Sequence, residues 1–183
     1  MSQHSDPKEE LVDHLPALRA FARSLARDRT AADDLVQDTI LKAWSNMDKF
    51  KPGTNLRAWL FTILRNTFYS NARKAKWEVE DADGVKAGQL KQKPTQDSAI
   101  EFNEFKQAFS RLPDDQREAL ILVGASGFSY EEAATMCDCA IGTMKSRVNR
   151  GRRKLAELME VKSEEIAEVD ATTLAALASS SGT

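Results

Sequence analysis

Apolar residues recur along the first part of this chain at three- and four-residue intervals, the pattern of an α-helix that buries one face. Residues 8–27 predict one such helix. A second is predicted behind Thr30 and Asp33, which suit an N-terminal cap, and it ends before a proline–glycine break. Its inward stripe is predicted to be Ala32, Leu35, Val36, Thr39, Ile40, Ala43, Trp44 and Met47. A third helix is expected over residues 55–75.

The helical spacing is interrupted between residues 77 and 98, where Asp, Gly, Lys, Gln and Pro predominate, so this segment is predicted to be a flexible linker. A further helix is predicted to begin at Pro113, because proline and the two acids that follow it are favoured in a first turn. That helix is expected to end at Gly124 and Gly127. The apolar positions that mark the return of helical spacing are Ile100, Phe102, Phe105 and Phe109.

No segment shows the alternation of β-branched residues that is typical of strands. The sequence therefore predicts an all-α fold with two small helical domains, at residues 8–76 and 99–160, joined by the flexible linker at 77–98. Residues 161–183 are acidic and are predicted to form a disordered tail, with a short amphipathic helix from about Ile166 to Leu177 as the alternative.

Residues 129–155 have the pattern of a helix, a tight turn and a second helix. The first helix begins with Ser129 and Glu132, whose spacing lets each side chain cap the other's backbone N–H. On the second helix an apolar stripe is predicted to face the core: Ile141, Met144, Val148, Leu155 and Met159. The side chains predicted to face outward or to flank the stripe are Lys145, Ser146, Arg147, Asn149, Arg150 and Arg153.

The charge of this second helix is of one sign. Six Lys or Arg residues and no acid lie between Cys139 and Ala156, whereas the whole chain has a net charge of −2. A protein with a net charge this close to zero does not bind DNA along its whole surface. Any DNA binding therefore has to come from surfaces on which basic residues are concentrated. The face could simply be solvated, but cations with Asn and Ser on a helix-turn-helix favour reading of a DNA major groove.

The third predicted helix carries a second basic surface. Phe61, Arg65, Tyr69 and Arg73 follow one another every four residues, and no acid lies between Arg57 and Lys76. Aromatic rings and cations that alternate in this way, here on a face predicted to point outward, suit single-stranded nucleic acid, which stacks its bases on rings. The alternative is that Phe61 and Tyr69 pack against a neighbouring helix.

On the second predicted helix the face opposite the core is acidic. It carries Asp34, Gln37, Asp38 and Ser45 around Leu41. A leucine surrounded by acids could anchor a basic helical partner, or it could be an ordinary exposed residue.

The cysteine, histidine and hydropathy patterns exclude several classes. Cys137 and Cys139 are the only cysteines, and His4 and His14 lie far from them in sequence, so no zinc site is expected. No nucleophile with a base and no phosphate-binding glycine loop is present, so we expect neither an enzyme nor a cofactor. No apolar run is long enough to span a membrane and no signal peptide is evident, so a soluble, cytoplasmic protein is expected.

Four blocks in order, ADDLVQDTILKAW, PGTNLRAWLFTILRNTFYS, LPDDQREALILVGASGFSYEEAA and GTMKSRVNRGRRKL, resemble bacterial sigma factors of the extracytoplasmic-function (ECF) branch. The resemblance covers residues 10–160 and is strongest to the EcfG subgroup of general stress response sigma factors. It implies sigma domains 2 and 4, promoter DNA and core RNA polymerase (β′ coiled coil and β flap) as partners, and a NepR-type anti-sigma protein as inhibitor.

The resemblance also implies roles for individual residues. The residues implied to bind polymerase are Asp33, Asp34, Gln37, Asp38 and Leu41. Those implied to bind the −10 element are Asn66, at a position where a base is flipped out, with Arg65, Tyr69, Arg73 and Lys74 on the same face. Those implied to read the −35 element are Lys145, Arg147, Asn149 and Arg150; Ser146 and Arg153 join them from the face analysis.

Two rival functions stay open at this point. A free-standing helix-turn-helix regulator would bind palindromic duplex DNA without polymerase, but it leaves the ring-and-cation helix unexplained. A sigma-like mimic would only sequester an anti-sigma protein, and such mimics carry a receiver domain for which this chain has no room. The sequence favours a sigma factor that directs initiation at −35/−10 promoters.

Overall fold

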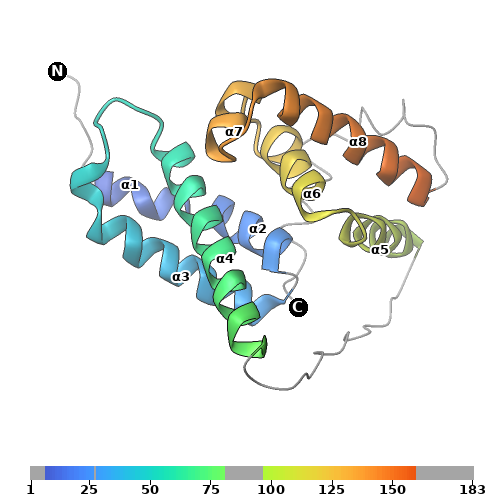
Figure 1. Cartoon of the computed structure of the whole chain (residues 1–183), viewed down its shortest axis with the longest axis horizontal. Helices are drawn as coiled ribbons and strands as arrows, with labels where there is room; N and C mark the ends of the chain where they lie inside the picture. The colour runs from blue at the N-terminus through green and yellow to red at the C-terminus, as the bar shows by residue number, and fades with distance from the viewer. Residues whose placement is uncertain (1–6, 27, 81–96, 160–183) are drawn as a thin grey trace.

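The computed structural model describes residues 7–26, 28–80 and 97–159, and within those ranges it contains helices and no strand (Figure 1). The all-α prediction is thus confirmed. The predicted tail at 161–183 and most of the predicted linker lie outside the described residues.

Helices α1 to α4 form the N-terminal bundle. Their bounds are α1 Pro7–Asp13, α2 Leu15–Ala26, α3 Arg29–Ser45, the 3₁₀ turn η1 Met47–Lys49, and α4 Leu56–Glu80. Helices α2, α3 and α4 pack on one another in all three pairs. Their common core is built from the spaced apolar residues and includes Leu18, Phe21, Leu35, Leu60 and Leu64.

The N-terminal bundle differs from the prediction at two helix ends. The single helix expected over 8–27 is broken at His14, because Pro16 has no N–H to donate to the preceding turn. Helix α3 is capped by Asp28, whose carboxylate accepts the N–H of Ala31 at 2.9 Å. Thr30, predicted as a cap, is inside the helix, because Asp28, two residues earlier, takes the cap position.

Two side chains predicted to be buried are exposed. Trp44 is 54% exposed on α3, and Ile141 is 41% exposed at the start of α8. Both lie near a helix end, where the neighbouring element no longer covers the stripe. The linker prediction was also too wide, since α4 runs on to Glu80 and α5 begins at Asp97.

Helices α5 to α8 form the C-terminal bundle. Their bounds are α5 Asp97–Ser110, α6 Asp114–Leu120, the π-helical turn η2 Ile121–Ala125, α7 Tyr130–Met136 and α8 Ile141–Met159. Helices α5, α6 and α7 all pack on α8.

The helix-turn-helix prediction is confirmed at atomic detail. Ser129 Oγ accepts the Glu132 N–H at 3.1 Å, and Glu132 Oε2 accepts the Ser129 N–H at 2.9 Å, which completes the capping box. The turn between α7 and α8 places Asp138 at φ 49°, in the left-handed region that ends many helices.

The two bundles are packed against each other, although the sequence indicated only two tethered domains. Helix α4 contacts α7, and α2 contacts α6 (Figure 1). The Phe61 ring lies between Phe21 of its own bundle, with centroids 4.8 Å apart, and Phe128 of the other, at 5.0 Å. Arg117 Nε donates to the Ser24 carbonyl at 3.0 Å and thus links α6 to α2.

Gly151 of α8 lies close against α6. A Cβ at this position would lie 3.0 Å from Leu120 Cδ1 and 3.3 Å from the Gln116 carbonyl oxygen. We therefore expect Gly151→Ala to lower the free energy of unfolding by about 1–3 kcal/mol through overpacking. Gly142, also on α8, has nothing within 4 Å of such a Cβ. Gly142→Ala is the matched control and should be neutral or slightly stabilising in urea denaturation; equal destabilisation by both would contradict the packing account.

Candidate nucleic-acid interface

The outward face of α8 is the more accessible of the two basic surfaces. Lys145, Asn149, Arg150 and Arg153 are exposed, as predicted, and Ser146 and Arg147 are half-buried. The Arg147 Nε lies 3.3 Å from Asp115 Oδ2 on α6, so this cation is partly neutralised. The Lys145 Nζ lies 5.8 Å from the Tyr130 ring centroid, which holds its stem against α7. The remaining polar side chains can reach into a groove without first breaking such a contact.

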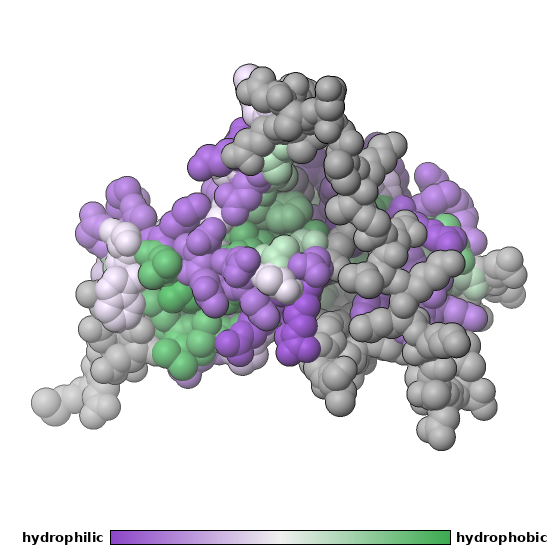
Figure 2. All heavy atoms as spheres, turned by 90° about the horizontal axis from the view of Figure 1, so that it is seen from below, coloured by the Kyte–Doolittle hydropathy of each residue, from purple (hydrophilic) through white to green (hydrophobic). Residues whose placement is uncertain are grey.

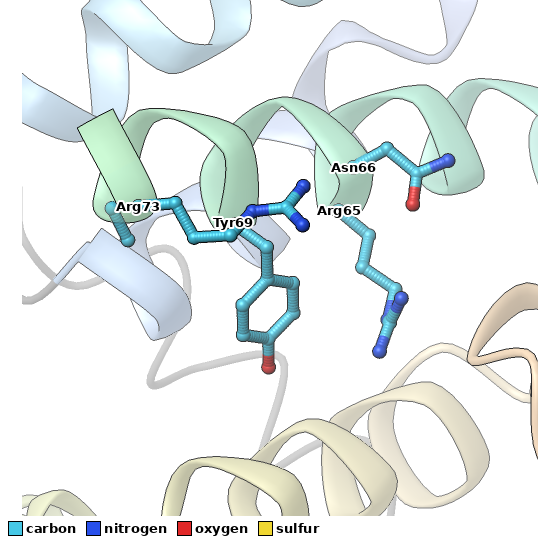
Figure 3. Close-up of a pocket in the computed structure, with 5 residues that line it drawn as sticks. Arg65, Asn66, Tyr69 and Arg73 are labelled. Carbon is cyan, nitrogen blue, oxygen red and sulfur yellow. The ribbon is translucent and has the colours of Figure 1, made fainter.

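The basic face of α4 is oriented differently from the prediction. Figure 3 shows Arg65 and Tyr69 pointing from α4 toward the C-terminal bundle, and both meet Glu118 of α6. The Arg65 Nε lies 2.8 Å from Glu118 Oε1, and Tyr69 Oη donates to Glu118 Oε2 at 3.2 Å. The Arg65 guanidinium also lies 4.8 Å from the Tyr69 ring centroid. These two side chains are therefore held by the other bundle.

The prediction that Phe61 faces outward is wrong. Its side chain is 1% exposed, because it fills the junction between the bundles. The four-residue spacing placed it correctly on one face with Arg65 and Tyr69, but the periodicity does not tell whether that face meets water or a second domain. The alternative, that Phe61 and Tyr69 pack against neighbouring helices, describes the structure better. Phe61 contacts Phe21 of its own bundle and Phe128 of the other, and Tyr69 contacts Glu118 of the other.

The Glu118 contacts shift three ionisation equilibria. Burial raises the pKa of Glu118 above its ordinary value, although Arg65 opposes this. Burial would lower the pKa of Arg65, but the charge and hydrogen bond of Glu118, with smaller contributions from Cys137 and Tyr69, together raise it. Burial and then the Glu118 charge raise the pKa of Tyr69 well above its ordinary value. Near neutral pH, Arg65 and Tyr69 therefore keep the protons with which they bind an acidic group.

A pocket of about 530 Å³ opens on the same face of α4 and is lined by Arg65, Asn66, Tyr69, Ala72 and Arg73 (Figure 3). Asn66, Arg73 and Lys74 are exposed. The structure thus brings four of the five predicted −10 residues to one pocket and places Lys74 one position beyond them. The volume of the pocket is in the range of small-molecule sites and suffices for a single nucleobase.

The acidic face of α3 has the exposure that the sequence predicted. Asp34, Gln37 and Asp38 are exposed, Asp33 is half-buried, and Leu41 is 66% exposed. Trp44 adds a second large apolar side chain one turn further along α3. Figure 2 shows hydrophobic surface over the N-terminal bundle with hydrophilic residues beside it.

Several interface residues escaped the sequence reasoning. Glu118 lies in a charged, helix-forming segment that gave no sign of burial, yet it is 1% exposed. Arg57 lies 4.8 Å from the Phe128 ring centroid, in a stretch where its charge suggested solvent or DNA. Arg117 is 2% exposed, with Nη2 at 2.7 Å from Asp114 Oδ1. Because Arg117 and Glu118 directly follow three polar residues, nothing local in the sequence marked either one for burial.

The described part of the chain offers neither a group of metal ligands nor a membrane-spanning helix. No group of three or more His, Cys, Asp or Glu side chains is placed to hold a metal ion there. None of the helices in those ranges is long and apolar enough to cross a membrane.

Comparison with known proteins assigns both bundles. The family model "Sigma-70 region 2" matches residues 11–78, and "Sigma-70, region 4" matches residues 102–155. The chain is 59% identical over 154 residues to the ECF RNA polymerase sigma factor EcfG of Rhodopseudomonas palustris, covering 84% of this chain and 85% of that protein.

Two solved structures are similar as well. The sigma factor RpoE of Bartonella quintana, in complex with the anti-sigma factor NepR, is 56% identical with a TM-score of 0.76, over 85% of this chain and 97% of that one. CnrH, in complex with the cytosolic domain of CnrY, is 28% identical with a TM-score of 0.60, over 83% and 86%.

Cys137 is buried close to Glu118, and its reactivity tests the packing at this contact. Burial raises the pKa of its thiol to about 12, with a further rise from the Glu118 charge. Because the thiolate is the reactive form, we expect native Cys139→Ala protein to react with a disulfide reagent at pH 8 far more slowly than after denaturation. The control is Cys137→Ala, in which the half-buried Cys139 remains. Immediate reaction of the native Cys139→Ala variant would contradict the assigned packing.

Proposed function

Because the chain belongs to the ECF branch of the sigma-70 family, we propose that it binds core RNA polymerase and directs initiation at the −35/−10 promoters of stress-response genes. We further propose residues 8–76 and 99–160 as the two functional units, sigma domains 2 and 4. The single observation that carries the proposal is the solvent-facing cationic helix α8 in a chain that is 59% identical to an ECF sigma factor.

In this proposal α8 enters the major groove of the −35 element. Lys145, Asn149, Arg150 and Arg153 are exposed on one helix and can reach base edges and phosphates together. Ser146 and Arg147 lie at the margin of this surface, and Arg147 also forms an ion pair with Asp115. Each bidentate arginine contact contributes about 1–3 kcal/mol of discrimination against the wrong base.

The −10 element is read on α4. The pocket beside Asn66 accepts one unstacked base, and Arg73 and Lys74 follow the backbone of the melted strand. Arg65 and Tyr69 complete this surface when they are released from Glu118. Stacking on the Tyr69 ring offsets part of the cost of taking a base out of the duplex, which is a few kcal/mol.

Core polymerase holds the two reading surfaces together. The exposed acidic face of α3, with Leu41 at its centre, fits the β′ coiled coil, and its charge suits a basic partner. The C-terminal bundle contacts the β flap. Binding both bundles to one enzyme holds them at high effective concentration at a promoter, which can raise the overall affinity by about 10²–10⁴.

A NepR-type anti-sigma protein is the proposed inhibitor. The support is the RpoE relative, which is 56% identical over 97% of its chain and was solved with NepR. The proposed place of action is the bacterial cytoplasm, where polymerase works. The proposed role is promoter selection without catalysis by the chain itself, in keeping with homologues that are initiation factors.

Run-off transcription tests the function directly. Core polymerase with this protein should produce a transcript of defined length from a template with a −35/−10 promoter, and neither component alone should. Polymerase binding without initiation would favour the mimic. Tight binding to palindromic duplex DNA without polymerase would favour a free-standing regulator.

Arg150 provides the sharpest test of −35 reading. Arg150→Ala should weaken binding to the −35 duplex by about 1–3 kcal/mol and relax the preference at one base pair. Arg111→Ala is the matched control, because Arg111 is exposed in the same bundle but lies between α5 and α6. Equal losses on −35 and random duplexes in Arg150→Ala would show that the residue contacts phosphate only.

A further inference from the structure

Glu118 is a buried acid at the centre of the contact between the bundles. Its side chain is 1% exposed, whereas Asp114 and Asp115 at the start of the same helix α6 are exposed. Its two oxygens are divided between two residues of the other bundle, Arg65 at 2.8 Å and Tyr69 at 3.2 Å. A carboxylate in this position occupies a site built for an anion.

The residues that Glu118 holds are those proposed to bind the melted −10 strand. A guanidinium that faces a buried carboxylate cannot also face a DNA phosphate. The Tyr69 hydroxyl, bound to the same carboxylate, holds the ring in its present orientation and keeps it from turning toward a base. The exposed cations of α8 are not involved in this contact. The docked arrangement therefore withholds Arg65 and Tyr69 from the −10 surface, while Asn66, Arg73 and Lys74 stay exposed, and it leaves the −35 surface accessible.

The contact is of a kind that can open. A buried carboxylate–guanidinium pair loses much of its Coulomb gain to desolvation, so its net contribution to docking is small. The raised pKa of Glu118 has the same cause, because burial removes water from its charged form. Around it, Arg57 lies over the Phe128 ring and Asn55 Nδ2 donates to Glu132 Oε1 at 3.0 Å, the latter pair being exposed. An anionic strand can compete with such an interface.

We propose that Glu118 is an internal competitor of the −10 strand: docked, it occupies Arg65 and Tyr69, and promoter DNA binds α4 only after the bundles separate. This inference rests on the proposed function. It assigns a regulatory role to a residue of the C-terminal bundle that contacts neither the −35 element nor the melted strand.

The test uses the full-length protein and a labelled single strand carrying the non-template −10 region of a promoter that gives a run-off product. Glu118→Gln keeps the shape and an oxygen for Tyr69 but removes the charge that holds Arg65. We expect the variant to bind this strand about tenfold more tightly. The reason is that fewer molecules are in the docked state, so a larger fraction of the protein is able to bind the strand. Binding to a −35 duplex should not change.

Glu104→Gln is the matched control. Glu104 is an exposed acid on α5, so the variant changes the net charge equally without touching the interface. It should bind the −10 strand as the unmodified protein does. Equal tightening by both variants would show a general charge effect and would overturn the proposal.

A locked protein covers the case in which Glu118→Gln fails to fold. Asn55→Cys and Glu132→Cys, in a Cys139→Ala background, can be joined by a short cleavable thiol crosslinker across the contact that the two side chains now make. Crosslinking should abolish −10 strand binding, keep −35 duplex binding, and be reversed by cleavage. Undiminished −10 binding in the locked protein would overturn the proposal. Failure of the unmodified protein to initiate transcription would instead contradict the proposed function.

Discussion

One buried ion pair, between Glu118 of α6 and Arg65 of α4, governs the arrangement of this molecule. It joins two bundles that each have their own core, and it does so with charged groups that water would otherwise solvate. Because desolvation cancels much of its Coulomb attraction, the pair specifies how the bundles meet more than it stabilises them. The rings of Phe61 and Phe128 supply apolar area at the same contact. The result is a defined docked state in which the buried apolar residues of the two bundles form one connected cluster.

The two reading surfaces differ because of this contact. The cations of α8 lie on the far side of a helix whose other face is packed on α5, α6 and α7, so docking leaves them in solvent. On α4, by contrast, Arg65 and Tyr69 lie on the side that meets the C-terminal bundle. A protein that must recognise duplex and melted DNA in sequence thus has its duplex-binding surface ready and two residues of its surface for melted DNA occupied.

Helical periodicity predicted the all-α fold, the helix-turn-helix, the capping box of Ser129 and the outward cations of α8, because these depend on local spacing and caps. It failed where a position depended on distant packing. Phe61 was placed on the right face but not against the right neighbour, and nothing local marked Glu118 for burial. Trp44 and Ile141 show the reverse error, since a stripe continues in sequence after the covering element has ended. The family resemblance added roles but not the docked arrangement.

The distance between the bundles tests the central claim most directly. Fluorophores on exposed positions of α3 and α8 would report it by single-molecule energy transfer in the full-length protein. The account predicts one short distance for the free protein and a clearly longer one in the complex with core polymerase and a melted promoter. An equally short distance in that complex would mean that Glu118 still covers the −10 surface during initiation, and the account would be wrong.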